Sequence, residues 1–277
     1  MSKILSMKQL VPTVYEAVVE APDIAKKAKA GEFLVVMPDE KGERIPLTIA
    51  DFDREKGTIT IVFMAIGTST HKLANMKAGD SYYAFVGPLG HASEIENYGT
   101  VVLVAGGVGT APVYPIAREM KAAGNKVICI QGARTKELLF WEDKIASVCD
   151  EHIITTDDGT FGRKALVTEP LKEVCEREKV DIAYAIGPVP MMKFCSLTTK
   201  PFGVKTIVSL NSIMIDATGM CGGCRVNVGG NTKFTCVDGP EFDGHEVDWN
   251  LLTSRQRIYV EEEKCSLQRY VEQGGRK

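Results

Sequence analysis

Three cysteines and one aspartate lie close together in the last quarter of the chain. They occur in the stretch Asp216-Ala-Thr-Gly-Met-Cys221-Gly-Gly-Cys224 and at Cys236, which gives the spacing D-x4-C-x2-C-x11-C. Plant-type [2Fe–2S] sites use C-x4-C-x2-C and a more distant fourth cysteine, so this is that spacing with Asp in the first position. Two thiolates separated by two residues can bind one iron from a tight turn, and the glycines let backbone N–H groups approach the sulfides. Because iron also accepts ligands other than cysteine, we expect these four residues to hold a [2Fe–2S] cluster.

Three other interpretations of this stretch stay open at the level of sequence. Zinc accepts both cysteine and aspartate ligands, so a zinc site would fit the same residues. A thioredoxin-like redox C-x-x-C would open a helix, which Gly-Gly starts poorly. Asp216 could also be an ordinary turn residue, with the fourth ligand supplied by Cys195, Cys265 or Asp238.

Length and composition describe an ordinary globular protein of two domains with a small third. The chain has 277 residues, of which 44% are hydrophobic and 25% charged, and its formal net charge is −3. A mixed-sign, slightly acidic chain argues against a nucleic-acid-binding protein. The cysteines outside the motif are scattered singly, which is typical of buried thiols. We find no apolar leader and no run of membrane-spanning length, and we expect a reduced, cytoplasmic protein with no membrane partner.

Residues 1 to about 97 carry the pattern of short strands broken by glycine and proline. The strand candidates are rich in β-branched residues and alternate partly in polarity. They lie at 13–20, 31–38, 57–66 and 80–88, with one short helix near 71–76. Such a series predicts a small antiparallel β-barrel.

From residue 98 the pattern changes to alternating strands and helices. Strands are expected at 100–105, 126–131, 152–156, 182–186 and 206–210, with helices near 110–123, 136–149, 164–178 and 189–199. This alternation predicts an open, mostly parallel α/β sheet. We therefore expect three parts: an antiparallel β-barrel in 1–97, a nucleotide-binding α/β domain in 98–210, and a cluster-binding segment with a charged helical tail in 211–277.

A glycine-rich loop, Gly106-Gly-Val-Gly-Thr-Ala-Pro112, joins the first parallel strand to its helix. It is not the G-x-G-x-x-G motif, but its glycines allow a ligand to approach and the helix N-terminus favours phosphate. Ligands of such sheets bind at the carboxyl ends of the strands. Gly187, Arg134, Asp157 and Asp158 follow other strands, where an Asp could hold a ribose hydroxyl and the Arg could meet a phosphate. Each of these loops, taken alone, could equally be a tight turn without a ligand.

Two segments of the first domain suit a flavin nucleotide. In R-x-P-x-T, from Arg44 to Thr48, the guanidinium can neutralise a pyrophosphate and the hydroxyl can bind a flavin ring nitrogen. In G-T-S-T, from Gly67 to Thr70, N–H and hydroxyl groups before a short helix can bind phosphate. Alone, either segment could be an exposed arginine before a strand or a capped helix.

The order of these motifs resembles the ferredoxin–NADP reductase superfamily over nearly the whole chain. The motifs are R-x-P-x-T, G-T-x-T, G-P-L-G, G-G-V-G-T-A-P, D-D-G, G-P-x-P-M-M and the iron–sulfur segment. More narrowly, the chain is similar to the branch that holds the electron-transfer subunit of dihydroorotate dehydrogenase and the small subunit of NADH-dependent ferredoxin:NADP oxidoreductase. Asp216 favours the second of these, whose cluster has one Asp and three Cys, over the first, which carries Cys there. Pro46 stands where the superfamily has a Tyr, so the resemblance does not imply ring stacking at that position.

The resemblance implies which cofactors bind and where. It implies that FAD contacts Arg44, Pro46, Leu47 and Thr48, and that its pyrophosphate contacts Gly67, Thr68, Ser69 and Thr70. It implies a nicotinamide-nucleotide site at Gly106, Gly107, Gly109, Thr110 and Pro112, with Arg134, Asp157, Asp158 and Gly187 nearby. Because Arg134 is a single cation and not the cluster that suits a 2′-phosphate, NADH is the expected nucleotide.

The hypothesis that follows is an electron-transfer flavoprotein subunit. Hydride passes between NAD(H) and FAD, and single electrons then pass through the [2Fe–2S] cluster, so that FAD links two-electron to one-electron chemistry. No side-chain acid, base or nucleophile is predicted, because hydride transfer needs none. The resemblance implies a heterodimer with a larger FAD and [4Fe–4S] subunit that couples NADH and, indirectly, ferredoxin to NADP(H) by electron bifurcation. The alternatives are the electron-transfer subunit of NAD-dependent dihydroorotate dehydrogenase, a non-enzymatic metal-stabilised flavoprotein, and an iron–sulfur regulatory subunit.

Overall fold

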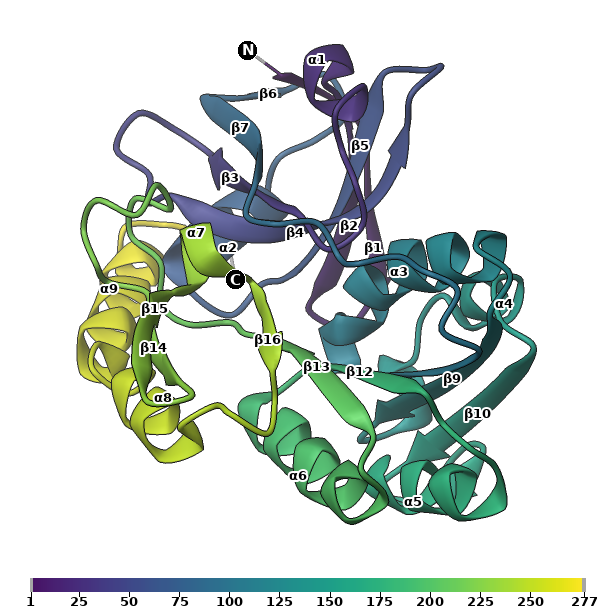
Figure 1. Ribbon diagram of the computed structural model, residues 1–277. Helices are drawn as coiled ribbons and strands as arrows, with labels where there is room; N and C mark the ends of the chain where they lie inside the picture. The colour runs from purple at the N-terminus through teal and green to yellow at the C-terminus, as the bar shows by residue number, and fades with distance from the viewer. Residues whose placement is uncertain (1, 276–277) are drawn as a thin grey trace.

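The first seven strands form a nearly closed antiparallel barrel. The computed structural model describes residues 2–275 and places this barrel against a parallel sheet and a C-terminal segment (Figure 1). The barrel strands are β1 (Ser2–Val11), β2 (Val14–Glu20), β3 (Phe33–Met37), β4 (Ile45–Asp53), β5 (Thr58–Met64), β6 (Ser81–Tyr82) and β7 (Ala84–Leu89). Their order is β6-β1-β2-β5-β4-β3-β7, with antiparallel pairing throughout. Only Tyr83 separates the two outermost strands, β6 and β7, so the chain itself connects the two edges of the barrel. The predicted antiparallel barrel is thus confirmed.

Successive side chains along the strands point alternately into the buried interior of the barrel and onto its outer face. Ile4, Leu34, Ile49 and Ile61 point inward and are 0% exposed, so they form the centre of the barrel core. The helices α1 (Pro22–Ala25) and α2 (Thr68–Ala74) add their own side chains to this core. The expected helix near 71–76 thus begins three residues earlier, and strands β1 and β4 were not among those predicted.

The second sheet is parallel except at one edge. Its strands are β8 (Thr100–Gly106), β9 (Lys126–Ala133), β10 (Glu151–Thr156), β11 (Arg163–Lys164), β12 (Ile182–Ile186), β13 (Lys205–Ser209) and β16 (Glu241–Asp243). The order is β11-β10-β9-β8-β12-β13-β16, and only the pairing of β13 with β16 is antiparallel. The chain leaves β8 toward β9 and later returns to its other side as β12. This reversal creates a crevice beyond the carboxyl ends of β8 and β12, where such sheets bind ligands.

Helices cover both faces of the parallel sheet, as the α/β pattern predicted. They are α3 (Thr110–Ala122), α4 (Glu142–Ala146), α5 (Thr168–Arg177) and α6 (Val189–Thr199), with the 3-10 turns η1 (Gly107–Gly109), η2 (Lys136–Leu138) and η3 (Lys200–Phe202). The continuous helix expected at 136–149 is wrong, because Trp141 has φ +60° and separates η2 from α4. No helix within residues 2–275 is long and apolar enough to cross a membrane.

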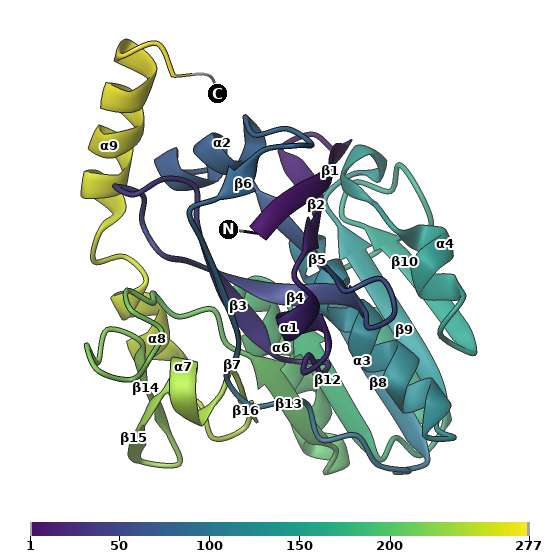
Figure 2. The same ribbon diagram turned by 90° about the horizontal axis from the view of Figure 1, so that it is seen from above.

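The C-terminal segment connects to both larger parts. It contains the hairpin β14 (Arg225–Val228) and β15 (Asn231–Phe234), then α7 (Thr235–Asp238), α8 (Trp249–Arg255) and α9 (Val260–Glu272). Strand β16 leaves this segment and extends the parallel sheet, while Trp249 and Leu252 of α8 enter the sheet's core. Helix α9 behaves differently, because it buries no residue and lies beside α2 of the barrel (Figure 2).

Candidate functional site

Two of the predicted cluster cysteines lie in direct contact below the surface. The Sγ atoms of Cys224 and Cys236 are 3.2 Å apart, and both residues are 2% exposed. Burial, reinforced by this hydrogen bond, raises the pKa of the Cys236 thiol to about 12. A thiol of this kind stays protonated until a metal displaces the proton, which is how metal sites couple to proton release.

Cys221 lies on the exposed side of the same loop. The N–H of Gly223 approaches the Cys221 Sγ at 3.4 Å. Gly219 and Gly222 have positive φ angles of +83° and +64°, so the loop curls in a way that side chains would strain. The donor chemistry of the three cysteines therefore fits an iron–sulfur cluster.

Asp216 accepts two backbone hydrogen bonds in this loop. Its Oδ1 accepts from the N–H of Thr218 and its Oδ2 from the N–H of Cys221, each at 2.8 Å. These N–H groups, that of Thr218 first, lower the pKa of Asp216. The aspartate thus acts as a turn residue here, yet a carboxylate has about four lone-pair sites and keeps capacity for a metal. Its bond to Cys221 N holds it next to the candidate ligands.

Within residues 2–275, no three His, Cys, Asp or Glu side chains converge closely enough to hold one metal ion. The other candidates for a fourth ligand lie in different surroundings. Cys195 packs inside the core of the parallel sheet, and Cys265 is exposed on α9. Asp238 accepts the N–H of Phe234 at 2.6 Å. The structure therefore favours none of these over Asp216.

The cysteine loop packs against the outer face of the barrel. Cys224 and Cys236 form one apolar cluster with Phe33 and Val35 of β3 and with Ala217. On the rim of this contact, Arg44 Nη1 donates to the backbone oxygen of Asp216 at 3.3 Å. The predicted flavin arginine and the predicted cluster loop, 172 residues apart, are therefore neighbours.

The predicted flavin contacts Pro46 and Thr48 lie on the outer face of β4, and Arg44 directly precedes this strand. Ile45 and Leu47 between them pack toward the barrel core. In the ladder with β3, Pro46 pairs with Val35 and Thr48 with Phe33. Leu47 is therefore the one predicted contact in this segment that faces inward.

The second predicted flavin segment forms the start of α2. Thr70 Oγ1 accepts the N–H groups of Ile66 and Gly67, both at 3.0 Å, so this hydroxyl caps the helix. Ser69 Oγ donates to Glu43 and Thr68 Oγ1 bonds Ser266 of α9 at 3.0 Å. A Cβ on Gly67 would meet nothing within 4 Å, so space for a ligand lies beside this glycine.

The glycine loop and the β12–α6 loop meet at the crevice of the parallel sheet. A Cβ on Gly109 would lie 2.1 Å from the Ile186 oxygen, and one on Gly106 would collide with Met191 Sδ at 2.3 Å. The Ile186 backbone therefore requires glycine at position 109, whereas a Cβ at Gly106 or Gly187 would first displace the Met191 side chain. Gly107 differs, because its φ is +54° and a Cβ there would meet nothing within 4 Å. Gly107 is therefore the position where the backbone is open to a ligand.

Arg134, Asp157 and Asp158 lie at the carboxyl ends of β9 and β10, on the same edge of the sheet. All three are exposed, and the N–H of Asp158 bonds the Arg134 oxygen at 3.2 Å. The Asp158 carboxylate accepts from Thr160, whose N–H lowers the pKa of Asp158. Pro112 lies in the first turn of α3, where it needs no N–H partner.

A buried polar chain below the glycine loop was not predicted. Gln131, 1% exposed, donates to the Phe140 oxygen at 2.9 Å and to Thr110 Oγ1 at 3.4 Å, while its Oε1 lies 3.0 Å from His152 Nε2. Burial lowers the pKa of His152, so the ring is neutral at pH 7. The signal for this chain was a single glutamine in an otherwise apolar strand. It fixes the environment of the Thr110 hydroxyl at the start of α3.

A buried carboxyl group at the junction of the barrel and the sheet was also missed. Ser93 Oγ donates to Glu241 Oε1 at 2.6 Å, and Gly31 leaves the space, since a Cβ there would lie 2.2 Å from the Ser93 hydroxyl. Burial, opposed by this hydrogen bond, raises the pKa of Glu241 to about 7. Nothing in the local sequence distinguishes this glutamate from a surface one.

Comparison with known proteins agrees with this geometry. Residues 103–196 match the oxidoreductase NAD-binding domain, and residues 211–248 match the iron–sulfur cluster binding domain of dihydroorotate dehydrogenase B. The chain is 46% identical over 275 residues to a dihydroorotate dehydrogenase B (NAD⁺) electron transfer subunit homolog of Thermotoga maritima, covering 99% of this chain and 97% of the relative. It is 32% identical to the dihydroorotate dehydrogenase B electron transfer subunit of Desulforamulus reducens, covering 90% and 97%.

A solved structure has the same fold over its full length. It belongs to a study of flavin-based electron bifurcation by NADH-dependent reduced ferredoxin–NADP oxidoreductase. The match has a TM-score of 0.93 at 46% identity and covers 98% of both chains. The chain therefore belongs to the family of dihydroorotate dehydrogenase B electron transfer subunits and their homologues, within the ferredoxin–NADP reductase superfamily, and is an oxidoreductase subunit with NAD-binding and iron–sulfur-binding domains.

Proposed function

We propose that this chain carries electrons from NADH through FAD and a [2Fe–2S] cluster to a larger FAD and [4Fe–4S] subunit. Together, the two subunits would form an NADH-dependent ferredoxin:NADP⁺ oxidoreductase that works by electron bifurcation. The proposed parts are a FAD-binding barrel (1–97), a NAD(H)-binding domain (98–210) and a cluster segment (211–277). Reduced thiols are needed for the cluster, so we propose a cytoplasmic location.

One observation carries this proposal: the predicted flavin face and the cysteine pair occupy one continuous surface of the barrel. Pro46 pairs with Val35 across the β3–β4 ladder, and Val35 packs in the same cluster as Cys224 and Cys236. Directly opposite side chains on one face of an antiparallel pair have Cβ atoms roughly 5 Å apart. A flavin on Pro46 and Thr48 would therefore lie one strand away from the cluster.

The chain's own residues would bind, orient and exclude water. When bound, FAD supplies the exchange between a two-electron hydride and single electrons, and the cluster carries the latter. Arg44 lies where its charge can meet phosphate or flavin while it holds the Asp216 carbonyl. Gly107 offers its backbone to the nucleotide, and the Gln131–Thr110 contact orients a hydroxyl at the start of α3. Phe33 and Val35 keep water out between the two cofactors.

The donor set also supports a two-iron cluster over a single zinc. A structural zinc site needs four ligands around one ion, whereas a [2Fe–2S] cluster spreads its ligands over two irons. Cys224 and Cys236 are paired, while Cys221 and Asp216 are joined to each other on the exposed side of the loop. Two pairs of candidate ligands are what a cluster with two irons requires.

The second candidate is the electron transfer subunit of a NAD-dependent dihydroorotate dehydrogenase. It is favoured by the names of the relatives and of the matched iron–sulfur domain. Asp216 favours the first candidate, because the dihydroorotate branch is expected to carry cysteine at that position. The two candidates share the electron path within this chain and differ in the partner.

The test is anaerobic purification of the chain from its host with whatever co-purifies. We expect FAD, iron and acid-labile sulfide in this chain, bleaching of the flavin by NADH, and a larger subunit with FAD and [4Fe–4S] clusters. A dihydroorotate-oxidising partner would decide for the second candidate. Zinc without sulfide, or flavin that NADH does not bleach, would refute the proposed electron path.

The role of Asp216 is tested in the same preparation. Asp216→Ala should lose the cluster or make it labile, because a ligand disappears and the N–H groups of Thr218 and Cys221 lose the carboxylate that accepts their hydrogen bonds. Asp216→Cys should keep the cluster with a changed reduction potential. A cluster spectrum that is unchanged in Asp216→Ala would show that another residue is the ligand.

A further inference from the structure

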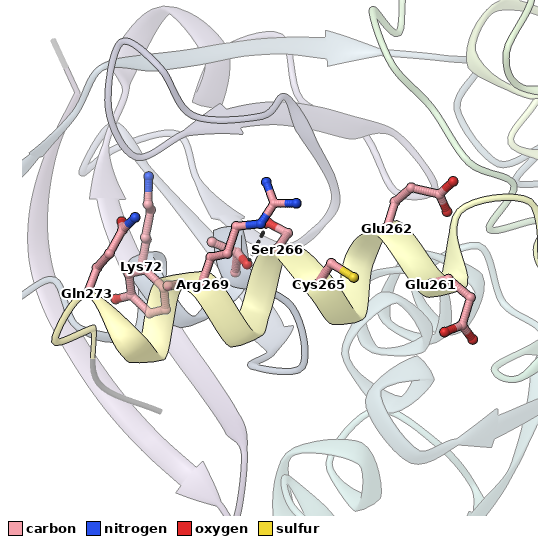
Figure 3. Close-up of a pocket in the computed structure, with 9 residues that line it drawn as sticks. Lys72, Glu261, Glu262, Cys265, Ser266, Arg269 and Gln273 are labelled. Atoms are coloured by element: carbon pink, nitrogen blue, oxygen red, sulfur yellow. Dashed lines mark hydrogen bonds between the residues drawn. The ribbon is translucent and has the colours of Figure 1, made fainter.

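A cleft of about 680 Å³ lies between α9 and α2 (Figure 3). Thr68 and Lys72 of α2 line one wall, and Glu262, Ser266, Arg269 and Tyr270 of α9 line the other. The volume falls in the range of about 300 to 1,000 Å³ that small-molecule sites occupy. The cleft opens beside Gly67, where a Cβ would meet nothing within 4 Å. It thus continues the space at the start of α2.

Few contacts hold α9 in this place. The helix has 13 residues and buries none of them, so hydrophobic burial contributes little to its position. Among residues 2–275, side-chain hydrogen bonds join Ser266 of α9 to Thr68 of α2 at 3.0 Å, and Tyr270 of α9 to Asn75, the residue after α2, at 3.3 Å. A ligand that fills the cleft would add contacts to both walls and fix the helix.

Positively and negatively charged side chains lie at different places along the cleft. Figure 3 shows the guanidinium of Arg269 and the ammonium of Lys72 extending to the same side of α9, with Glu262 farther along. Lys72 is paired with Asp39 at 2.9 Å. The Arg269 guanidinium has no hydrogen bond or ion pair with any residue in the described range 2–275. A cation left without a partner beside two hydroxyl groups suits a phosphate group.

We propose that this cleft holds the ADP half of FAD, and this inference rests on the proposed flavin site of the barrel. Arg269, with the Thr68 and Ser266 hydroxyls, would bind the diphosphate. The Tyr270 ring, one residue beyond Arg269 on α9, offers an aromatic surface to adenine. Helix α9 is then part of the FAD site and not only a tail that packs against a partner.

The test compares FAD with FMN, which lacks the ADP half. Flavin-depleted protein is titrated with each flavin, and binding is followed by fluorescence quenching. Arg269→Gln should weaken FAD binding about tenfold, or roughly 1.4 kcal/mol, and leave FMN binding unchanged. Lys264→Gln is the matched control, because it removes one positive charge from the same helix outside the cleft, where Lys264 pairs with Glu261 at 2.8 Å.

Hydrogen exchange on the wild-type protein gives a second readout. FAD, but not FMN, should slow the exchange of amides in residues 260–272, because only FAD reaches both walls. Equal FAD affinity in Arg269→Gln and wild type, with no protection of α9, would overturn the inference while the flavin site stands. If the wild-type protein binds neither flavin, the proposed function fails first and the inference falls with it.

Discussion

Replacing Glu241 by glutamine should stabilise this protein at pH 8 and change its stability little at pH 4. The Glu241 carboxyl group lies between the barrel and the parallel sheet, where Ser93 Oγ donates to it at 2.6 Å. The titratable groups that face it are the phenols of Tyr98 and Tyr184, whose pKa values are raised mainly by burial and also by the charge of Glu241. No cation is among these neighbours, so the ionised carboxylate has only a hydroxyl to stabilise it.

The magnitude follows from linkage between protonation and folding. Burial raises the pKa of Glu241 from its ordinary value of 4.5 to about 7 in the folded protein. The folded state therefore binds more protons than the unfolded state between these values, and stability falls as pH rises from about 4.5 through about 7. The difference corresponds to about 3 kcal/mol at 1.36 kcal/mol per pKa unit, which is an upper figure. Glutamine removes this cost and still offers Oε1 to Ser93.

The assay is urea unfolding of the wild-type protein and Glu241→Gln under anaerobic conditions at pH 4.5 and pH 8. The free energy of unfolding of the variant should exceed that of the wild type by up to about 3 kcal/mol at pH 8 and should nearly match it at pH 4.5. Glu94→Gln is the control, because Glu94 makes an exposed pair with Lys205 and such pairs contribute about 0 to 1 kcal/mol. A constant difference between Glu241→Gln and wild type across this pH range would refute a buried, titrating Glu241.

Three further predictions concern the nucleotide crevice and the cluster. Gly107→Ala should fold, lose roughly 1–2 kcal/mol of its free energy of unfolding because of the positive φ, and bind NADH more weakly. Gly109→Ala should fail to fold, because its Cβ would meet the Ile186 oxygen. Urea unfolding and NADH titration of both variants test these expectations. Gln131→Leu should cost about 1–3 kcal/mol and lower NADH affinity, and unchanged NADH affinity would show that it does not orient Thr110. Cys236→Ser should lose iron and sulfide while exposed Cys265→Ser keeps both, and iron retained in Cys236→Ser would remove it from the ligand set.

Strand β4 shows why some elements of the barrel could not be predicted. A proline inside a strand pattern argues against an interior strand, because proline cannot donate to a ladder. Yet β4 pairs with β3 at residues 45–48 and with β5 only from Ile49 onward, so Pro46 has a neighbour on one side. Because the strands are staggered, Pro46 lies where β4 has a partner strand on one side only. This stagger depends on contacts between distant strands, which the local sequence pattern does not show.

The candidate site also contains some features that depend on neighbouring residues in the sequence and others that depend on residues far apart in the chain. The cysteine spacing and the glycine loop are local signals, because one turn must present several groups to one ligand, so the sequence alone could indicate both as candidate sites. The Ser93–Glu241 contact joins residues 148 positions apart and needs the space left by Gly31. Gln131 lies between these cases, since a polar residue in an apolar strand indicates a buried partner without telling which one.

The C-terminal segment fixes its cysteine loop relative to both the barrel and the parallel sheet. Its cysteine loop packs on Phe33 and Val35 of the barrel, and its strand β16 hydrogen-bonds to β13 of the parallel sheet. Glu241, where β16 begins, contacts the linker between barrel and sheet through Ser93. A shift of the sheet against the barrel would therefore have to break the β16 ladder, the Glu241 contact or the packing of Cys224 and Cys236. The distance from the proposed flavin face to the cysteine loop is thus set by the same contacts that hold the barrel and the sheet together. Under the proposed function, substitutions at this junction should change electron transfer along with stability.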